Sequence, residues 1–279
     1  MKKMLALLLA LVMVLSLAAC ASSQPAAAST ETAETTETTE PAAEESAEAP
    51  AESGKTYTVG VCQLVQHEAL DAATQGFIDA LKEELGDAVT VDVQNASGDS
   101  VNCGTIVNGF VSKGVDLIMA NATPALTAAV SATADIPILG TSITAYGVAL
   151  DIDDFNGTVG GNISGTSDLA DLQAQAQMIL DWFPETKTVG LLFCSAEPNS
   201  RYQIDEVRKA LEAQGVTCEE FAFTDSNDVS SVTQKAADFS DVVYIPTDNT
   251  AASNTEAIAN VLIPAGVPAV CGEEGLCRG

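Results

Sequence analysis

The sequence predicts an α/β protein with two similar domains in tandem, each built on a parallel sheet. Short runs rich in β-branched residues alternate with amphipathic stretches of ten or more residues, which is typical of β-α-β units. This alternation occurs on both sides of a glycine-rich segment at 157–168, GTVGGNISGTSD. Polar residues also gather directly after the predicted strands, where parallel sheets bind ligands.

Residues 1–20 have the pattern of a lipoprotein signal peptide. Two lysines precede an uninterrupted apolar run, which predicts a secretory signal rather than a membrane span of the mature protein. The sequence Leu17-Ala18-Ala19-Cys20 resembles a bacterial lipobox, in which the signal is cut before the cysteine and the cysteine is acylated. Each buried methylene contributes roughly 0.8 kcal/mol, so palmitate-type chains on Cys20 would anchor the protein at the extracytoplasmic face of the bacterial cell membrane. A simple secretory signal with an incidental cysteine is the alternative.

Residues 21–55 are expected to form a disordered acidic tether. Eight glutamates and no basic residue occur between Glu31 and Glu52, among Ala, Ser, Thr and Pro. Such a segment has little apolar surface to bury and repels itself. The formal net charge of the whole chain is −28, which makes nucleic acid an unsuitable partner.

The N-terminal α/β lobe is predicted over 56–156. Its first helix is indicated by Phe77, Ile78, Leu81 and Leu85, which recur at helical spacing. The expected strands are 57–62, 89–94, 116–121 and 136–141, and the expected helices are 69–85, 100–112 and one that opens at Thr123-Pro124.

The segment 157–168 is interpreted as the interdomain crossover, because glycines and short polar side chains let the backbone pass between domains. Asp168 stands where the N-cap of the following helix is expected. The second α/β lobe is predicted over 169–279. Its expected helices are 169–183, 199–214, 229–238 and 249–263, and its expected strands are 188–193, 216–221, 241–246 and 267–272.

Six cysteines remain when Cys20 is set aside. Cys62, Cys194 and Cys271 fall at or near the ends of apolar runs, where a small buried thiol is the usual role. A chain of this length can bury an ample core without cross-links. We therefore expect free core thiols rather than a disulfide framework, with Cys271 and Cys277 as the one pair whose state stays open.

Several polar segments follow the predicted strands and predict two facing rims around a cleft for a small ligand. Together they resemble the ABC-transporter substrate-binding lipoproteins of the tryptophan/tyrosine-binding, TrpX-like type, over roughly residues 56–275. The resemblance rests on the lipobox, the acidic tether and the following segments: HEALDAATQGFIDALK, ATPAL, GTSIT, NISGTSD, SAEPNS and PTDN.

The resemblance implies a type I periplasmic-binding-protein fold, in which two Rossmann-like lobes close on a hinge around an amino acid. It also implies delivery of that ligand to an ABC permease and its ATPase, with no catalytic residue, no cofactor and no metal. The ligand-binding positions that it implies in this sequence are Gln66, His67, Thr123, Pro124, Thr144, Thr166, Asp168, Glu197, Asn199, Ser200, Asp248 and Asn249.

The chemistry of these residue types suits an amino acid. Hydroxyls at helix N-termini, such as Thr123, Thr166 and Ser200, bind a carboxylate well. Carboxylates such as Asp168, Asp248 or Glu197 bind an ammonium group through charge-assisted hydrogen bonds. Aromatic residues near the rims are few, which leaves open amino acids other than tryptophan and tyrosine, and also small amphipathic solutes.

Two other function classes compete with a transport receptor. A ligand-sensing domain of a surface signalling system would use the same cleft. An enzyme would have to rely on His67, the single histidine, whose HExxD context lacks a third metal ligand and predicts an ordinary rim residue. The resemblance further implies a return segment to the first lobe after 267–272. The chain is expected to lack it as a C-terminally truncated fragment, and a degenerate version with an incomplete hinge is the alternative.

Overall fold

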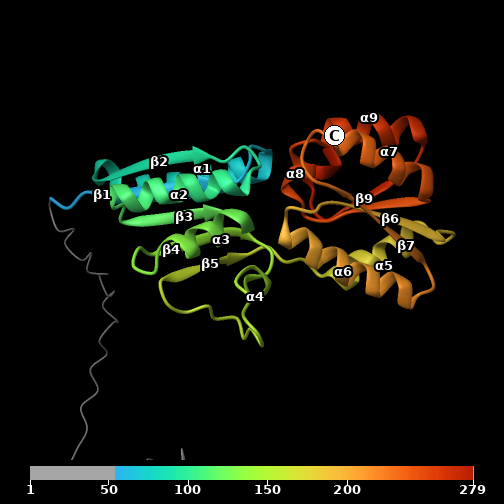
Figure 1. Ribbon diagram of the computed structural model, residues 1–279, viewed down its shortest axis with the longest axis horizontal. Coiled ribbons are helices and arrows are strands. Elements are labelled where there is room, and N and C mark those ends of the chain that lie inside the picture. The colour runs from blue at the N-terminus through green and yellow to red at the C-terminus, as the bar shows by residue number, and fades with distance from the viewer. Residues whose placement is uncertain (1–53, 279) are drawn as a thin grey trace, which may run out of the picture. The chain divides into compact units, whose positions relative to one another are not determined.

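The computed structural model describes residues 54–278 and contains two parallel sheets, each flanked by helices (Figure 1). The strand order is β2-β1-β3-β4-β5 in the first sheet and β7-β6-β8-β9 in the second. The predicted signal peptide, the acylated Cys20 and nearly all of the tether lie outside the described residues. Between 54 and 278, no helix is long and apolar enough to cross a membrane.

The first lobe comprises the elements from β1 to β5. β1 lies inside its sheet and pairs in parallel with β2 on one side and β3 on the other. The elements are β1 (Tyr57–Gln63), α1 (Glu68–Leu85), η1 (Gly86–Ala88), β2 (Val89–Asn95), α2 (Ser100–Lys113), β3 (Leu117–Asn121), α3 (Thr123–Ala132), β4 (Ile138–Ile143), α4 (Tyr146–Ala149) and β5 (Ile163–Ser167).

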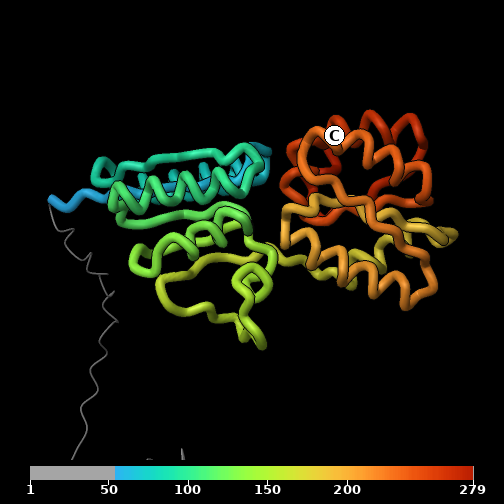
Figure 2. The backbone as a smooth tube through the Cα atoms, in the orientation of Figure 1, coloured from blue at the N-terminus to red at the C-terminus, as the bar shows by residue number. Residues whose placement is uncertain are grey.

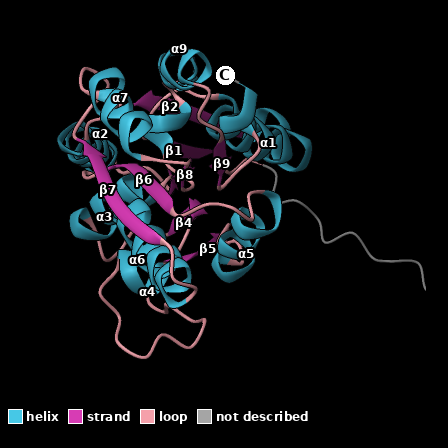
Figure 3. Ribbon diagram, turned by 90° about the vertical axis from the view of Figure 1, so that its right-hand side faces the viewer, coloured by secondary structure: helices cyan, strands magenta, loops and turns pink. Residues whose placement is uncertain are grey.

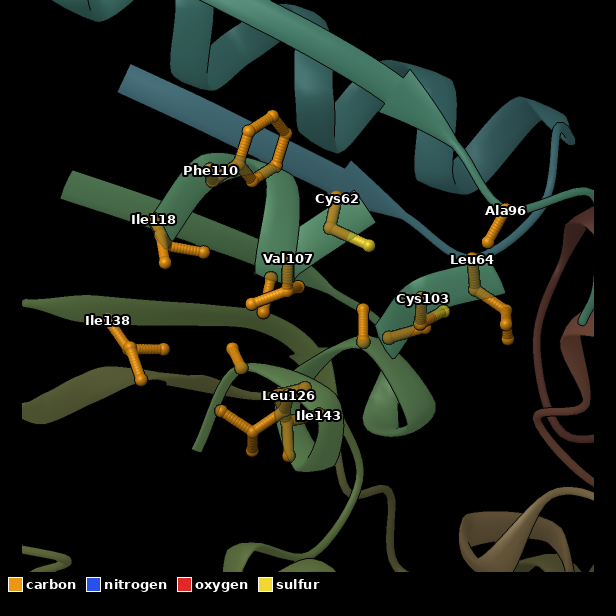
Figure 4. Packing of buried hydrophobic residues seen from close by; sticks show 14 of the residues in the cluster. Cys62, Leu64, Ala96, Cys103, Val107, Phe110, Ile118, Leu126, Ile138 and Ile143 are labelled. Carbon is orange, nitrogen blue, oxygen red and sulfur yellow. The ribbon is translucent and has the colours of Figure 1, made fainter. Parts of the chain in front are cut away.

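The core of the first lobe lies mainly between its sheet and helices α2 and α3. Val107, Phe110 and Leu126 pack there against Ile118 and Ile138 of the strands (Figure 4). Gly60 of β1 permits this packing, because a Cβ at that position would lie 2.6 Å from the ring of Phe110. A smaller cluster between the opposite face of the sheet and α1 contains Val59 and Val61.

Strand β5 lies within the segment 157–168 that the sequence analysis assigns to the interdomain crossover. It completes the first sheet beside β4, and Gly165 is the register partner of Gly140. The two glycines leave a slot for Tyr146, whose hydroxyl donates a 3.1 Å hydrogen bond to the carbonyl oxygen of Gly140. The chain then passes into the second lobe through residues 168–171 (Figure 2).

The second lobe comprises the elements from α5 to η2, with helices on both faces of its sheet (Figure 3). One core cluster lies under α5 and α6, and another lies under α7, α8 and α9. The elements are α5 (Leu172–Trp182), β6 (Thr188–Cys194), α6 (Pro198–Ala213), β7 (Thr217–Phe223), α7 (Val229–Phe239), β8 (Val242–Ile245), α8 (Asn249–Ala252), α9 (Thr255–Ala265), β9 (Ala269–Cys271) and η2 (Gly275–Arg278).

Two helix predictions need correction. The helix expected from 169 begins at Leu172, and its N-cap is Asp171, whose Oδ1 accepts a 3.0 Å hydrogen bond from the backbone N–H of Ala174. Asp168 therefore does not cap it. The helix expected over 249–263 is divided into α8 and α9. Asn254 lies at the break, and its side chain donates a 2.7 Å hydrogen bond to the carbonyl oxygen of Thr250.

Candidate functional site

Helix α3 begins directly after β3 with a strained residue and an unpaired hydroxyl. Ala122, between strand and helix, has a φ of +87°, which is rare for a residue with a side chain. Thr123 follows it, buried, and its Oγ1 has no hydrogen-bond partner. Because buried polar atoms are normally paired, this hydroxyl is available to a ligand at a helix N-terminus.

Thr144 and Asp168 directly follow the ends of the adjacent strands β4 and β5. The backbone N–H of Asp168 donates to the carbonyl oxygen of Ile143 at 3.1 Å. The surrounding protein raises the pKa of the Asp168 carboxyl, a hydrogen bond from Thr144 counteracts this, and the negative charge of Glu273 raises the pKa further. Asp168 keeps an exposed surface, so solvent moderates these effects. Two acids of different lobes thus create a negative region that favours a cationic group.

Glu197, at the start of α6, is fully engaged within the second lobe. Its Oε1 accepts hydrogen bonds of 2.8 Å from both the backbone N–H and the hydroxyl of Thr250. Its Oε2 accepts from the side chain of Asn199 and from the backbone N–H and side chain of Asn249, at 2.6–3.2 Å. This buried carboxylate therefore holds the N-terminus of α8 against the N-terminus of α6, which accounts for its presence without a ligand.

Asp248 has a similar structural role beside it. Its carboxylate accepts from the backbone N–H of Cys194 at 2.6 Å and, as the N-cap of α8, from that of Ala251 at 2.7 Å. Burial raises the pKa of Asp248 to about 7, and the charge of Glu197 adds to this effect, while the two backbone hydrogen bonds and Ser200 counteract it. The negative charge of Glu197 therefore disfavours a second negative charge on Asp248.

A pH-dependent stability follows from Asp248. A carboxyl whose pKa rises from 3.8 to about 7 on folding binds its proton more tightly in the folded state. It stabilises the fold fully below pH 3.8, and this contribution is lost as the pH rises through about 7. Urea titrations of the wild type and Asp248→Asn should show a difference in the free energy of unfolding that changes in favour of the variant between about pH 4 and pH 8. A constant difference would contradict the assignment.

Asn199, two residues after Glu197, presents another buried polar atom without a hydrogen-bond partner. Its Nδ2 donates to the carbonyl oxygen of Thr247 at 3.2 Å, whereas its Oδ1 is buried without a partner. Gln203, one turn further along α6, supports it by donating to the carbonyl oxygen of Asn199 at 3.1 Å. Helix α6 contacts both α3 and α4 of the first lobe. The first turns of α3 and α6 thus each contain a buried polar atom that has no hydrogen-bond partner.

The N-terminus of α1 also reaches the second lobe. The Nε2 atom of His67 lies 3.2 Å from Oδ1 of Asn249, and the carboxylate of Glu68 forms an ion pair with Arg278. His67 therefore contacts α8 rather than forming a metal site. No group of three or more His, Cys, Asp or Glu side chains is arranged for a metal ion anywhere in residues 54–278.

Three of the predicted ligand-binding residues lie apart from these contacts. Gln66 lines a hollow of about 400 Å³ beside α1 and β2, together with Gln63 and Asp71. Pro124 is buried in the first turn of α3 and lines another hollow of about 310 Å³ between α2 and α3. Thr166 is exposed on β5. Ligand contact by these three residues stays a prediction without local support.

The chain matches a known protein family along nearly all of its described length. The sequence model of a family described as ABC transporter substrate binding protein matches residues 58–278. The chain belongs to this family. Its members are extracytoplasmic solute-binding proteins and not enzymes, so the family match excludes the enzyme alternative.

Relatives of this substrate-binding protein include a tyrosine-binding protein of Clostridioides difficile, which is 33% identical over 230 residues. That alignment covers 80% of the chain and 66% of the relative, so the chain spans just under two thirds of its length. The structure of an ABC domain from Streptococcus pneumoniae in complex with L-Trp is 32% identical, with a TM-score of 0.75 and coverage of 80% of this chain and 76% of that one.

A more distant structure defines the fold class of this substrate-binding protein. The leucine-binding protein LivK from Thermotoga maritima superposes with a TM-score of 0.52 at 14% identity, covering 74% of this chain and 60% of that one. The predicted α/β architecture of the type I periplasmic-binding-protein class is thereby confirmed.

Two residues of this substrate-binding protein stand out only in three dimensions. Ser142 has a φ of +56° near the end of β4, beside the strained Ala122 at the end of the neighbouring β3. Strained residues cluster at functional sites, where the surrounding structure holds them. No sequence signal distinguishes either residue, because an alanine or a serine seldom adopts a positive φ.

Proposed function

We propose that the protein is the receptor of an ABC importer and binds an amino acid, preferably an aromatic one, between its two lobes. The proposal draws on the relatives, since one is a tyrosine-binding protein and another binds L-Trp. It also draws on the polar groups that both lobes direct to the region where α3 and α6 meet.

The observation that carries the proposal is that two of the five buried side-chain atoms without a hydrogen-bond partner in residues 54–278 are Oγ1 of Thr123 and Oδ1 of Asn199. They lie in the first turns of α3 and α6, which come from different lobes and contact each other. Helix N-termini attract anions through free N–H groups and the helix dipole. The ligand carboxylate would accept from the Thr123 hydroxyl, and an ammonium or ring N–H group would donate to Oδ1 of Asn199.

The ammonium group of the ligand has a second partner in Asp168. Burial raises the pKa of its carboxyl group, and the negative charge of Glu273 adds to this effect, so a cation beside the two acids would stabilise the charged form of Asp168. The ligand would thus contact Asp168 from the first lobe and Asn199 from the second. A ligand that contacts both lobes shifts the equilibrium between open and closed forms toward the closed form.

The rest of the chain fits transport at a membrane. Acylation of Cys20 would anchor the protein to the extracytoplasmic face of the cell membrane, and residues 21–55 would serve as the tether. The permease and ATPase of the importer are the proposed partners, and the closed form is the one that the permease would receive.

The proposal is tested by isothermal titration of the mature chain with the twenty amino acids. We expect tryptophan, tyrosine or phenylalanine to bind more tightly than leucine by at least tenfold. Tight binding of an aliphatic amino acid alone would change the ligand but keep the receptor assignment. If no amino acid binds and none raises the melting temperature, the ligand class is wrong.

Replacement of Thr123 by valine is expected to weaken binding by about tenfold to a hundredfold, because a buried hydrogen bond to a charged group contributes about 1.5–3 kcal/mol. Valine has the same shape, and the hydroxyl that it removes has no partner in the ligand-free protein. The melting temperature should therefore stay the same or rise. The matched control is Thr105→Val at an exposed position of α2, which should leave affinity unchanged. Equal affinities of Thr123→Val and the wild type would rule out the carboxylate contact.

A further inference from the structure

Cys271 and Cys277 lie on two segments that fold back on each other. Cys271 ends β9 and packs against the core cluster that also contains buried Leu276. The carboxylate of Glu273 accepts hydrogen bonds from the backbone N–H groups of Gly275 and Leu276, at 2.7 Å and 2.9 Å. These contacts curl the chain into η2, which packs against β9. The curl returns Cys277 toward Cys271.

The two thiols are direct neighbours. Burial raises the pKa of the Cys271 thiol, and both the charge and a hydrogen bond of Cys277 raise it further. The thiol of Cys277 also lies 4.0 Å from the carbonyl oxygen of Glu273, at the start of the curled segment. The hydrogen bond from the backbone N–H of Leu276 to the carboxylate of Glu273 holds the curl independently of the thiols.

The other cysteines differ in their access to an oxidant. Cys62 and Cys103 are neighbours in the core of the first lobe, but both are fully buried (Figure 4). Cys194 is buried under α8, and Cys218 lies on β7 with no cysteine among the groups that affect its pKa. Cys277 is exposed. A neighbouring pair with one exposed member therefore occurs at Cys271 and Cys277.

We propose that Cys271 and Cys277 form a disulfide bond in the exported protein. Disulfides form and persist outside the cytoplasm, where the members of this family act. The oxidant is a disulfide of a small thiol or of a protein oxidase. The Cys277 thiolate attacks one sulfur of that disulfide and releases one thiol. The Cys271 thiolate then attacks Cys277 in the mixed disulfide and releases the second. The chain loses two protons and two electrons, and the oxidant gains them as two thiols.

The bond would control a contact between the lobes. Arg278 follows Cys277 directly and forms ion pairs with Glu274 and with Glu68, the first residue of α1. An exposed ion pair is weak when its residues must first be ordered. A disulfide would hold η2 against β9 and so place Arg278 next to Glu68. Reduction would release η2, and the contact with the first lobe would weaken.

Peptide mapping of the full exported chain, alkylated before any reduction, tests the bond. Trypsin cleaves after Lys235 and Arg278, so the peptide 236–278 contains both Cys271 and Cys277 and no other cysteine. We expect this peptide without alkyl groups and two hydrogen masses lighter than its reduced form. A peptide with two alkyl groups would overturn the proposal. A linked pair of peptides 56–82 and 83–113 in its place would assign the disulfide to Cys62 and Cys103, and would also overturn it.

Hydrogen exchange tests the consequence for Arg278. Amides of residues 275–278 should exchange at least tenfold faster after reduction, and Cys277→Ser should show the same increase without reductant. The control is Cys218→Ser, which should leave these rates unchanged. If the peptide contains the disulfide but reduction changes none of these exchange rates, the proposal that the disulfide keeps η2 against β9 is overturned. Neither outcome depends on which amino acid binds, so failure here and failure of the proposed function are distinguishable.

Discussion

Gly165→Ala is expected to destabilise the first lobe strongly. Gly165 has a φ of +150°, and a Cβ would lie 2.1 Å from the carbonyl oxygen of Gly140 and 2.2 Å from the hydroxyl of Tyr146. The backbone of β4 cannot move without breaking its pairing with β3 and β5. We expect a loss of about 3–5 kcal/mol in the free energy of unfolding, since backbone strain and overpacking each cost about 1–3 kcal/mol.

Chemical denaturation of the purified chain measures this loss, and the melting temperature should fall by about 2–4 °C for each kcal/mol. The control is Gly161→Ala in the same segment. Gly161 also has a positive φ, of +64°, but no atom lies within 4 Å of a Cβ placed there. Its replacement should cost only about 1 kcal/mol. Equal losses for the two variants would show that the slot around Tyr146 is not tightly packed.

Glu197→Gln is the second large effect that the structure predicts. Every hydrogen bond of the Glu197 carboxylate within residues 54–278 is accepted from an N–H or O–H group, and both oxygens are used. A glutamine must turn its NH₂ group toward one of these sets of donors, which leaves buried N–H groups facing each other. We expect a loss of about 3 kcal/mol or more, as for other buried charges whose partners are left unpaired.

The same substitution at an exposed position separates this effect from a general change in charge. Glu212 lies exposed near the end of α6, and Glu212→Gln should change the free energy of unfolding by less than about 0.5 kcal/mol. Near-ultraviolet circular dichroism would report whether α8 loses its packing in Glu197→Gln. A free energy of unfolding within about 1 kcal/mol of the wild-type value would mean that Glu197 does not hold α8 in place. Its carboxylate would then again be a candidate for ligand binding.

Most of the fold could be predicted because the central strands of both sheets are buried on both faces. β1 and β6 read as continuous apolar runs, and the sequence predicts each to within one residue of its observed end. β5 escapes prediction because Ile163–Ser167 is largely Ser, Gly and Thr and is mostly exposed. Its strand character comes from pairing with β4. The break between α8 and α9 depends on the Asn254 side chain, which the helical periodicity does not report.

The candidate site could be predicted only in outline. The sequence places polar residues after the strands, and Thr123, Asn199 and Asp168 lie at such positions in the structure. It does not reveal that the carboxylates of Glu197 and Asp248 already accept hydrogen bonds from other groups of the protein. Some of those donors lie about fifty positions away in the sequence. It also does not reveal the positive φ angles that the tertiary structure imposes at the ends of β3 and β4.

The distance along the chain between Glu197 and its partners has a consequence for the order of folding. Asn249 and Thr250 lie 52 and 53 residues after it, so the hydrogen bonds can form only when β6 and β8 are already side by side. Contacts of such sequence separation are slow to form. We expect the Glu197 contacts to be absent from the folding transition state, so that Glu197→Gln accelerates unfolding and leaves the refolding rate nearly unchanged. The lifetime of the native protein outside the cell would then depend on the Glu197 contacts, which form after the folding transition state.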